Sequence, residues 1–138
     1  MRNIIISVIL ITVLNIFFTK YGYSQSQKVV IGALIEYEYF ATSTVEDVPC
    51  EFFKGTFAET IRRIDIKDKI ELKRLANYAN KFKETTPKPI DVRVLFTFRY
   101  RRSQEKYCMD RWGLWVNKKT GKCYDNKLLT DFVLKRCQ

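Results

Sequence analysis

Few residues of this 138-residue chain have the types and spacing that catalysis requires, because the chain contains no histidine. Catalytic triads and acid–base pairs that use imidazole as the base are therefore excluded. A pair of carboxylates remains as a design for a hydrolase, and Glu36 and Glu38 would share a strand face about 6.6 Å apart. Charged residues that face solvent are ordinary on a strand with one buried face. We therefore expect two solvated glutamates, and we retain a small histidine-free hydrolase using these paired carboxylates as an alternative.

A second catalytic candidate is a serine–lysine dyad formed by Ser103 and Lys106. An activated lysine has to be desolvated, whereas both residues lie in a polar stretch that we expect to be an exposed turn. The chain has only five glycines, and none belongs to a glycine-rich loop of the kind that cradles a phosphate group. We therefore predict no catalytic residue and no cofactor.

The four cysteines could bind a metal, react as thiols or pair in disulfides. The chain has no Cys-x-x-Cys pair and no histidine, so the ligand spacing of a zinc site is missing and we predict no metal site. A catalytic thiol is equally unexpected, because no histidine is present to activate it. An even number of cysteines in an exported domain is typical of structural disulfides. We therefore predict two disulfides among Cys50, Cys108, Cys123 and Cys137.

Spacing along the predicted elements favours one of the three possible pairings. Cys123 and Cys137 flank a predicted helix of about ten residues, which would hold them about 15 Å apart. A disulfide needs Cα atoms within about 7 Å. Cys123 is also expected to lie about seven residues, or about 23 Å, along the strand from Cys108. The prediction is therefore that Cys108 pairs with Cys137 and that Cys50 pairs with Cys123.

A third group of candidate residues is basic. These residues could form one cationic surface on a strand and the hairpin that follows it, with aromatic side chains stacking on the bases of a nucleic acid. The alternative is a solvated sheet face whose arginines prevent edge-to-edge aggregation, with the tryptophans in the core. The candidate surface consists of Arg99, Arg101, Arg102, Lys118, Lys119 and Lys122, with Tyr107, Trp112 and Trp115 as stacking platforms.

The two tryptophans raise a separate question of orientation. Trp112 and Trp115 are three residues apart, so in a regular strand they face opposite sides. Unless Gly113 inserts a bulge, one of them has to point outward. An exposed tryptophan is typical of a binding hot spot, although the polar loop at Thr42 could also cover it.

The first 24 residues are typical of a cleavable signal peptide. Arg2 provides the positive start, residues 4–18 are almost entirely apolar, and small residues precede a cleavage point before Gln25. The apolar run is shorter than the roughly 20 residues that span a membrane. No cysteine precedes Cys50, so we expect no lipid anchor. We also expect no transmembrane segment after cleavage. The protein is therefore predicted to be exported, to the periplasm or the medium.

Residues 25–138 are enough for one hydrophobic core and too few for two, so we expect a single small domain. This domain carries 23 basic and 15 acidic residues, a net charge of +8. Nine of the basic residues and only three of the acidic ones lie in residues 91–122. A field of this sign attracts nucleic acid, anionic lipid or acidic glycans, and it also favours solubility.

Hydrophobic periodicity predicts the elements that would position these residues. Residues 29–40 and 92–101 alternate as half-buried strands, and residues 107–116 continue as a strand. Residues 50–66 fit either a helical stripe or an alternating strand, and we prefer the strand. Asp68 caps a helix over residues 69–83, a turn with glycine follows at 118–121, and a last helix covers residues 127–136.

The order of these elements favours the α+β class, with an antiparallel sheet of about four to five strands and two helices packed on one face, stapled by disulfides. The function predicted from the sequence is a non-enzymatic extracytoplasmic binding or protein-interaction domain. We expect its partner to be a protein or an anionic surface. The main alternative is a cationic effector that binds nucleic acid or membrane.

Overall fold

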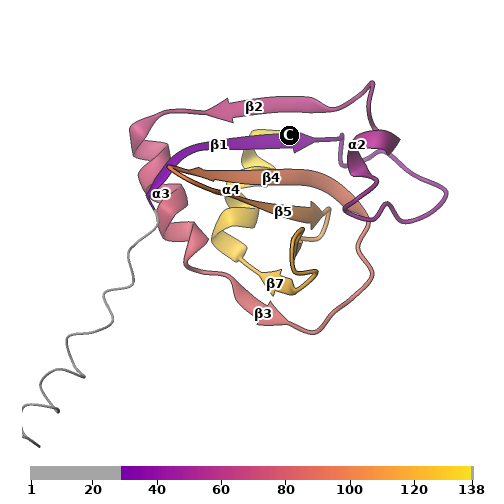
Figure 1. The fold of residues 1–138 in the computed structure, drawn as a ribbon. Helices are drawn as coiled ribbons and strands as arrows, with labels where there is room; N and C mark the ends of the chain where they lie inside the picture. Colours follow the sequence, from indigo (N-terminus) through magenta and orange to yellow (C-terminus); the bar gives the residue numbers. More distant parts are fainter. Residues whose placement is uncertain (1–28, 138) are drawn as a thin grey trace, which may run out of the picture.

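A computed structural model describes residues 29–137 of the chain, so the signal peptide expected at residues 1–24 lies outside the described residues. Within residues 29–137 the fold is one antiparallel sheet of seven strands in the order β2-β1-β4-β5-β6-β7-β3 (Figure 1). No helix of this described part is long and apolar enough to cross a membrane. The strands are β1 (Val30–Tyr37), β2 (Arg62–Ile66), β3 (Lys83–Thr85), β4 (Val92–Tyr100), β5 (Gln104–Asp110), β6 (Leu114–Asn117) and β7 (Cys123–Asp125).

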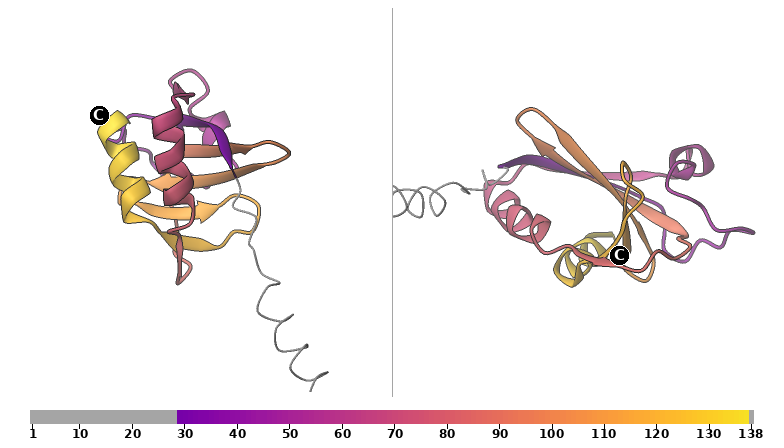
Figure 2. Two further views of the ribbon diagram at one scale, coloured as in Figure 1. Left: turned by 90° about the vertical axis from the view of Figure 1, so that its left-hand side faces the viewer. Right: turned by 60° about the horizontal axis from the view of Figure 1, so that its bottom comes forward.

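Two helices, α3 (Lys69–Ala79) and α4 (Lys127–Cys137), lie side by side over one face of the sheet (Figure 2). A short helix, α2 (Phe53–Thr56), packs on the opposite face against β4. The α+β class and the antiparallel sheet are confirmed. The expected four to five strands are too few, because β3 was not expected and the single strand expected over residues 107–116 is two strands, β5 and β6. The expected pair of helices on one face also omitted α2.

Two local expectations are corrected by short-range structure. The ambiguous segment 50–66 contains both α2 and β2, so neither single interpretation was sufficient. The strand expected over residues 107–116 is two strands, because the chain turns at Asp110–Gly113 and β6 returns antiparallel to β5. The helix start at Asp68 is confirmed, since its side chain accepts hydrogen bonds from Ile70 N and Glu71 N.

The main core lies between the sheet and the two long helices. Residues paired across strands share a face, so Ile35 and Phe96 lie on this inner side together. Aromatic and branched side chains from four strands interlock there with both helices, which removes a large apolar area from water. The fully buried members of this core are Ala33, Ile35, Leu75, Val94, Phe96, Phe98, Met109, Trp115, Leu129 and Val133.

A second, smaller core covers part of the outer face of the sheet, the face away from α3 and α4. The alternation of apolar and basic residues in 92–101 predicted this face to be solvated and basic. The chain between β1 and β2 folds over β4 and β5 and buries Leu95 and Cys108. This cover also includes α2, whose Phe53 is fully buried. The members of the outer core are Val48, Cys50, Phe53, Phe57, Val92, Leu95 and Cys108.

Arg93 is the residue for which the prediction of a solvated outer face is most clearly wrong, since its side chain is fully buried. Its guanidinium forms a 2.6 Å ion pair with Asp91 and donates to Thr42 O and Thr44 Oγ1 at 3.1 Å. It also lies over the ring of Phe57. Arg93 therefore fastens the covering loop to β4 instead of contributing to a basic surface.

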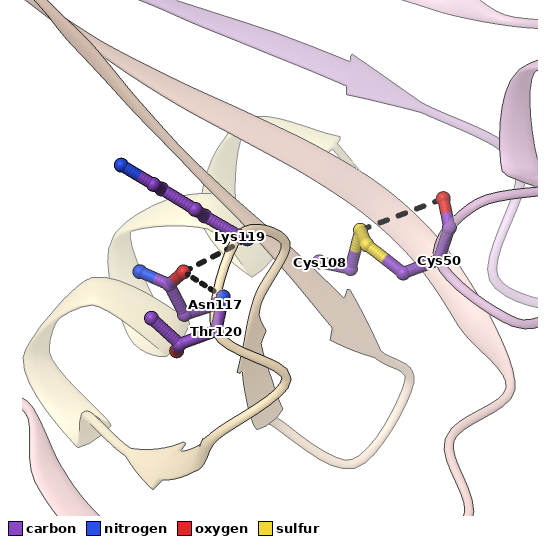
Figure 3. Close-up of a disulfide and its surroundings, with 5 residues drawn as sticks. All are labelled: Cys50, Cys108, Asn117, Lys119 and Thr120. Carbon is purple, nitrogen blue, oxygen red and sulfur yellow. Dashed lines mark hydrogen bonds between the residues drawn. A yellow bond between two sulfur atoms is a disulfide. The ribbon is translucent and has the colours of Figure 1, made fainter.

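The cysteine pairing differs from the prediction. Cys50 and Cys108 form a disulfide with a Cα–Cα distance of 5.8 Å (Figure 3). Cys123 and Cys137 are free and buried. The expected bridges Cys108–Cys137 and Cys50–Cys123 are therefore wrong.

The register of the sheet explains this error. Because the chain turns back after β5, Cys108 pairs with Val116, and Val116 in turn pairs with Cys123. The three side chains share the outer face in neighbouring strands, so Cys108 and Cys123 are not separated along one strand as expected. Cys137 ends α4 on the inner side, where Cys108 cannot reach it, whereas the covering segment brings Cys50 directly over Cys108.

Candidate functional site

Glu36, the first candidate carboxylate, is buried rather than solvated, with only 2% of its surface exposed. Its carboxylate pairs with Lys54 Nζ at 2.8 Å and with Arg63 Nε at 3.1 Å. Lys54 belongs to α2 and Arg63 to β2, so this one carboxylate fastens two neighbouring elements to β1. Its contacts give it a structural role.

Glu38 is also buried, just beyond the end of β1. Its side chain accepts hydrogen bonds from Thr42 Oγ1 at 3.0 Å and from Thr60 Oγ1. Burial alone would raise the pKa of Glu38, but the hydrogen bonds from Thr60 and Thr42 outweigh it and lower the pKa below its ordinary value. A carboxyl group held ionised in this way is a poor general acid at neutral pH. The geometry therefore gives the paired-carboxylate hydrolase no support.

The serine and lysine of the second catalytic candidate are not enclosed by the fold. Ser103 is exposed in the turn between β4 and β5, where its carbonyl accepts a 2.9 Å hydrogen bond from Tyr100 N. Lys106 follows on β5 and is only partly buried. Among residues 29–137, no cluster of three or more acidic or cysteine side chains is placed to hold a metal ion.

The predicted basic residues gather on two turns at one end of the sheet. Arg101 and Arg102 are exposed on the turn between β4 and β5. Lys118 and Lys119 are exposed on the turn between β6 and β7, which joins β5 through a 2.9 Å hydrogen bond from Lys118 N to Lys106 O. Because β4 and β6 run in the same direction, both turns project from the same end of the sheet.

Two of the predicted basic residues are already neutralised by ion pairs. Arg99 pairs with Asp65 of β2 at 2.9 Å. Lys122 pairs with Glu84 of β3 at 2.9 Å, and the hydrogen bond and charge of Glu84 raise the pKa of this lysine. Within residues 29–137, Arg101, Arg102, Lys118 and Lys119 have no ion-pair partner, and we name these four residues the cationic turns.

The lysine turn has a well-defined backbone. Asn117 Oδ1 accepts hydrogen bonds from Lys119 N at 2.9 Å and Thr120 N at 3.0 Å (Figure 3). Gly121 has a φ of +69°, as the sequence predicted for this turn, and its amide donates to Asn117 O at 2.8 Å. The two lysine side chains are therefore exposed on a backbone that is held by hydrogen bonds.

The expected stacking platforms do not belong to the basic surface. Trp115 is fully buried, packs edge-on against Phe96 and donates its indole N–H to Thr130 Oγ1 at 2.8 Å. Tyr107 is buried on the same side and stacks on Phe82 with ring centroids 4.3 Å apart. Both rings are part of the main core. Neither ring is therefore placed to stack on a ligand among the basic residues.

Trp112 is the outward tryptophan, with 84% of its surface exposed. It lies on the turn between β5 and β6, whereas Arg101 and Arg102 lie at the other end of β5. The structure therefore separates this tryptophan from the cationic turns. The loop at Thr42, which was the candidate cover, contacts the neighbouring Arg111 and leaves Trp112 exposed.

The turn that carries Trp112 is braced by buried groups. Asp110 Oδ1 accepts hydrogen bonds from Trp112 N at 2.8 Å and from Leu114 N at 2.9 Å. Gly113 has a φ of +90°, which is unfavourable for any residue with a side chain, and it lies against Thr130 of α4. The backbone beneath the exposed indole is therefore fixed.

Neighbouring residues join this turn to two other segments. Arg111 donates to Thr42 O at 3.2 Å and pairs with Asp91 at 3.3 Å, which links the turn to the loop after β1. A pocket of about 490 Å³ is lined by Trp112 together with residues that include Lys88 and Pro89. The indole therefore stands at the edge of a concave surface.

Three further exposed apolar residues lie on segments that the sequence did not assign to a site. Tyr39 and Val45 belong to the loop after β1, and Phe52 directly precedes α2. This loop is held near the tryptophan turn by the Arg111 contact with Thr42. We name Tyr39, Val45, Phe52 and Trp112 the exposed apolar group. Periodicity did not reveal this group because its members lie outside regular strands.

Comparison of the chain with protein-family models, with curated proteins and with solved structures finds no match.

Proposed function

We propose that this protein is a non-enzymatic binding domain that holds a protein partner through the exposed indole of Trp112. The observation that carries this proposal is a tryptophan exposed to 84% on a turn whose backbone is fixed by Asp110. Large aromatic side chains in water are unfavourable for an isolated domain. They are also the residues most enriched in binding hot spots, where a rigid backbone reduces the entropy lost on association.

The surroundings of Trp112 support a protein partner. Tyr39, Val45 and Phe52 add exposed apolar area at the same end of the domain. The nearby loop also carries exposed acidic residues, Glu46 and Asp47. Exposed carboxylates can form the polar rim of a protein interface, and their charge would repel an anionic membrane.

The proposal includes action outside the cytoplasm. A small domain with a Cys50–Cys108 disulfide is compatible with an oxidising compartment. The composition of residues 1–24 supports the same interpretation. Intact mass of the protein recovered from its native host tests this part, with a start at or near Gln25 as the expected result.

Site-directed photo-crosslinking tests the partner proposal. A photoreactive phenylalanine analogue at position 112 should crosslink one protein species, whereas the same analogue at Ile70, an exposed position on α3, should not. The crosslinked protein is then purified and its affinity measured by calorimetry. Trp112→Ala should lose about 2 kcal/mol or more, about thirtyfold in affinity, and Ile70→Ala should be unchanged. Equal crosslinking at both positions would contradict the proposal.

A second candidate function, a cationic effector that binds nucleic acid, is favoured by the cationic turns. Arg101, Arg102, Lys118 and Lys119 are exposed and lack ion-pair partners within residues 29–137. If the turns contact phosphates, the affinity should fall as the salt concentration rises. The slope of log affinity against log salt concentration should steepen by about 0.7 for each phosphate contacted on single-stranded nucleic acid.

Titration of a single-stranded oligonucleotide over a range of salt concentrations separates the two functions. Replacing both arginines by glutamine should reduce the slope by about 1.4 if both contact phosphates. Arg74→Gln with Lys135→Gln, which removes the same charge from α3 and α4, is the matched control. An equal change in the control would reject specific binding by the turns. Trp112→Ala should leave this binding unchanged.

A further inference from the structure

A second pocket lies away from Trp112, between the start of β1 and α3. Its volume is about 670 Å³, within the range of roughly 300–1,000 Å³ that is typical of small-molecule sites. The start of β1 runs beside α3, as both views of the ribbon show (Figures 1 and 2). The pocket is a groove along this junction.

The floor of the groove is apolar. Val30 and Leu72 are almost fully buried beneath it, and the small side chain of Ala76 leaves space on the helix side. Val29 and Ile31 form the wall on the strand side and are largely exposed. Two branched apolar side chains left in water beside an open groove represent apolar area that a ligand would bury.

The rim of the groove is cationic and polar. Lys67, Lys69 and Lys73 lie along it, together with the amides of Asn77 and Asn80, and no acidic residue lines it. In the described part of the chain, Lys69 and Lys73 form no ion pair.

The acidic residues nearest in sequence leave Lys69 and Lys73 unpaired. Asp65 pairs with Lys67 at 3.0 Å and with Arg99 at 2.9 Å. Asp68 caps the start of α3, and Glu71 pairs with Arg136 of α4. The charge of Lys69 and Lys73 is therefore available to a ligand.

The neighbouring surface has the same sign. Val30 pairs with Tyr100, so the start of β1 lies next to the turn that carries Arg101 and Arg102. These cations strengthen the positive field at the mouth of the groove.

We propose that this groove binds a fatty acid, with the acyl chain along Val30, Leu72 and Ala76 and the carboxylate between Lys69 and Lys73. An apolar floor suits an apolar chain, and the two rim lysines without an ion-pair partner, Lys69 and Lys73, suit a negative head group. The chain's own residues directly before the groove, Gln25 to Lys28, are polar and end in a cation. Their chemistry complements neither the floor nor the rim.

Calorimetric titration tests the proposal with probes that share a chain and differ in the head group. The protein is expressed with its own leader and purified in the form that the cell produces. Dodecanoate, used below its micelle concentration, should bind one site. Dodecyltrimethylammonium, with the same chain and the opposite charge, and acetate, with the head group alone, should not bind.

Substitutions then place the binding in the groove. Lys69→Glu with Lys73→Glu should weaken dodecanoate binding at least tenfold, and Ile31→Asp should do the same by placing a charge in the wall. Lys88→Glu with Lys135→Glu, which changes the net charge equally at the opposite end of the sheet, is the control and should leave the affinity within twofold. Thermal unfolding verifies that each variant is folded.

Three results would overturn the proposal. Equal binding of the cationic amphiphile would show that the rim charge is irrelevant. An equal loss of affinity in the control variant would show that net charge alone attracts the probe. No binding of dodecanoate by the folded protein would show that the groove is closed to this ligand or filled by residues 25–28.

Discussion

Thr130 of α4 connects the buried and the exposed tryptophan. Its Oγ1 accepts the indole N–H of Trp115 at 2.8 Å, and its Cγ2 would lie only 2.8 Å from a Cβ added to Gly113, the residue after Trp112. One side chain therefore satisfies a buried donor of the core and limits the space beneath the exposed turn.

Thr130→Val should destabilise the protein although the two side chains have nearly the same shape. The substitution leaves the buried Trp115 Nε1 without its acceptor, which costs about 1–3 kcal/mol. Thr130→Ser keeps the oxygen and should lose about 0.8 kcal/mol for one methyl group. Urea unfolding followed by fluorescence measures both. Equal stability of the two variants would show that the indole donor has another partner.

Gly113→Ala should destabilise the protein by at least about 2 kcal/mol. An alanine at positive φ costs about 1–2 kcal/mol, and the added methyl group also has to displace Thr130. Gly121→Ala is the matched control, because Gly121 also has a positive φ but a Cβ there meets open space. If the contact with Thr130 matters, combining Gly113→Ala with Thr130→Ala should cost less than the sum of the two single changes.

The segments with strong local signals were predictable from the sequence. In β4, apolar residues occupy every second position over nine residues, and α3 begins at a side-chain cap. The sequence of each segment alone therefore indicates its structure. Gly113 indicated a bulge or bend, but the full reversal at Asp110–Gly113 was not expected, because it depends on a side chain that bonds two backbone amides after the strand. That one turn reversed the expected register and with it the predicted cysteine pairing.

The candidate site was predictable only in part. Sequence spacing showed that either Trp112 or Trp115 had to point outward, but the turn and α4 determine which one. The burial of Glu36 and Arg93 could not be inferred, because both are covered by a segment that is distant in sequence. Charged residues on an alternating strand are predicted to be solvated unless such a cover is known.

Removal of the disulfide should cost about 2–5 kcal/mol, the usual effect of a bridge that closes a long loop. The bridge spans 58 residues and fastens the outer cover to β5. Reductant should therefore lower the stability of the native protein and have no effect on a variant with both Cys50 and Cys108 changed to alanine. Non-reducing peptide mapping should recover one linked pair and two free thiols, whereas a peptide joining Cys123 to Cys137 would contradict this assignment.

Glu36→Gln should cost about 1–3 kcal/mol, because it removes a charged acceptor of two hydrogen bonds from a buried position. Its partners Lys54 and Arg63 are partly exposed and can be solvated, which limits the loss. Asp65→Asn, which breaks two surface ion pairs, is the control and should cost about 0–1 kcal/mol. Urea unfolding at neutral pH compares the two variants. Equal losses of unfolding free energy would show that the buried position of Glu36 does not make its contacts more stabilising than surface ion pairs.

The stability of the protein should fall at alkaline pH, and part of the fall should depend on Cys137. Burial raises the pKa of this thiol from about 9 to about 12, because the thiolate would be poorly solvated at the end of α4. The folded state therefore binds the proton more tightly than the unfolded state. The resulting stabilisation is fully present below pH 9 and is lost as the pH rises towards 12.

Cys137→Ala should remove this contribution, so the melting temperature of the variant should depend less steeply on pH above 9. Val133→Ala, which also shortens a buried side chain of α4 but removes no titratable group, is the matched control and should keep the slope of the native protein. Burial also raises the pKa of Tyr100 and Tyr107, so a decline should remain in Cys137→Ala. Melting curves recorded at intervals from pH 8 to 12 measure the slopes, and an unchanged slope in Cys137→Ala would show that this thiol is solvated in the folded protein.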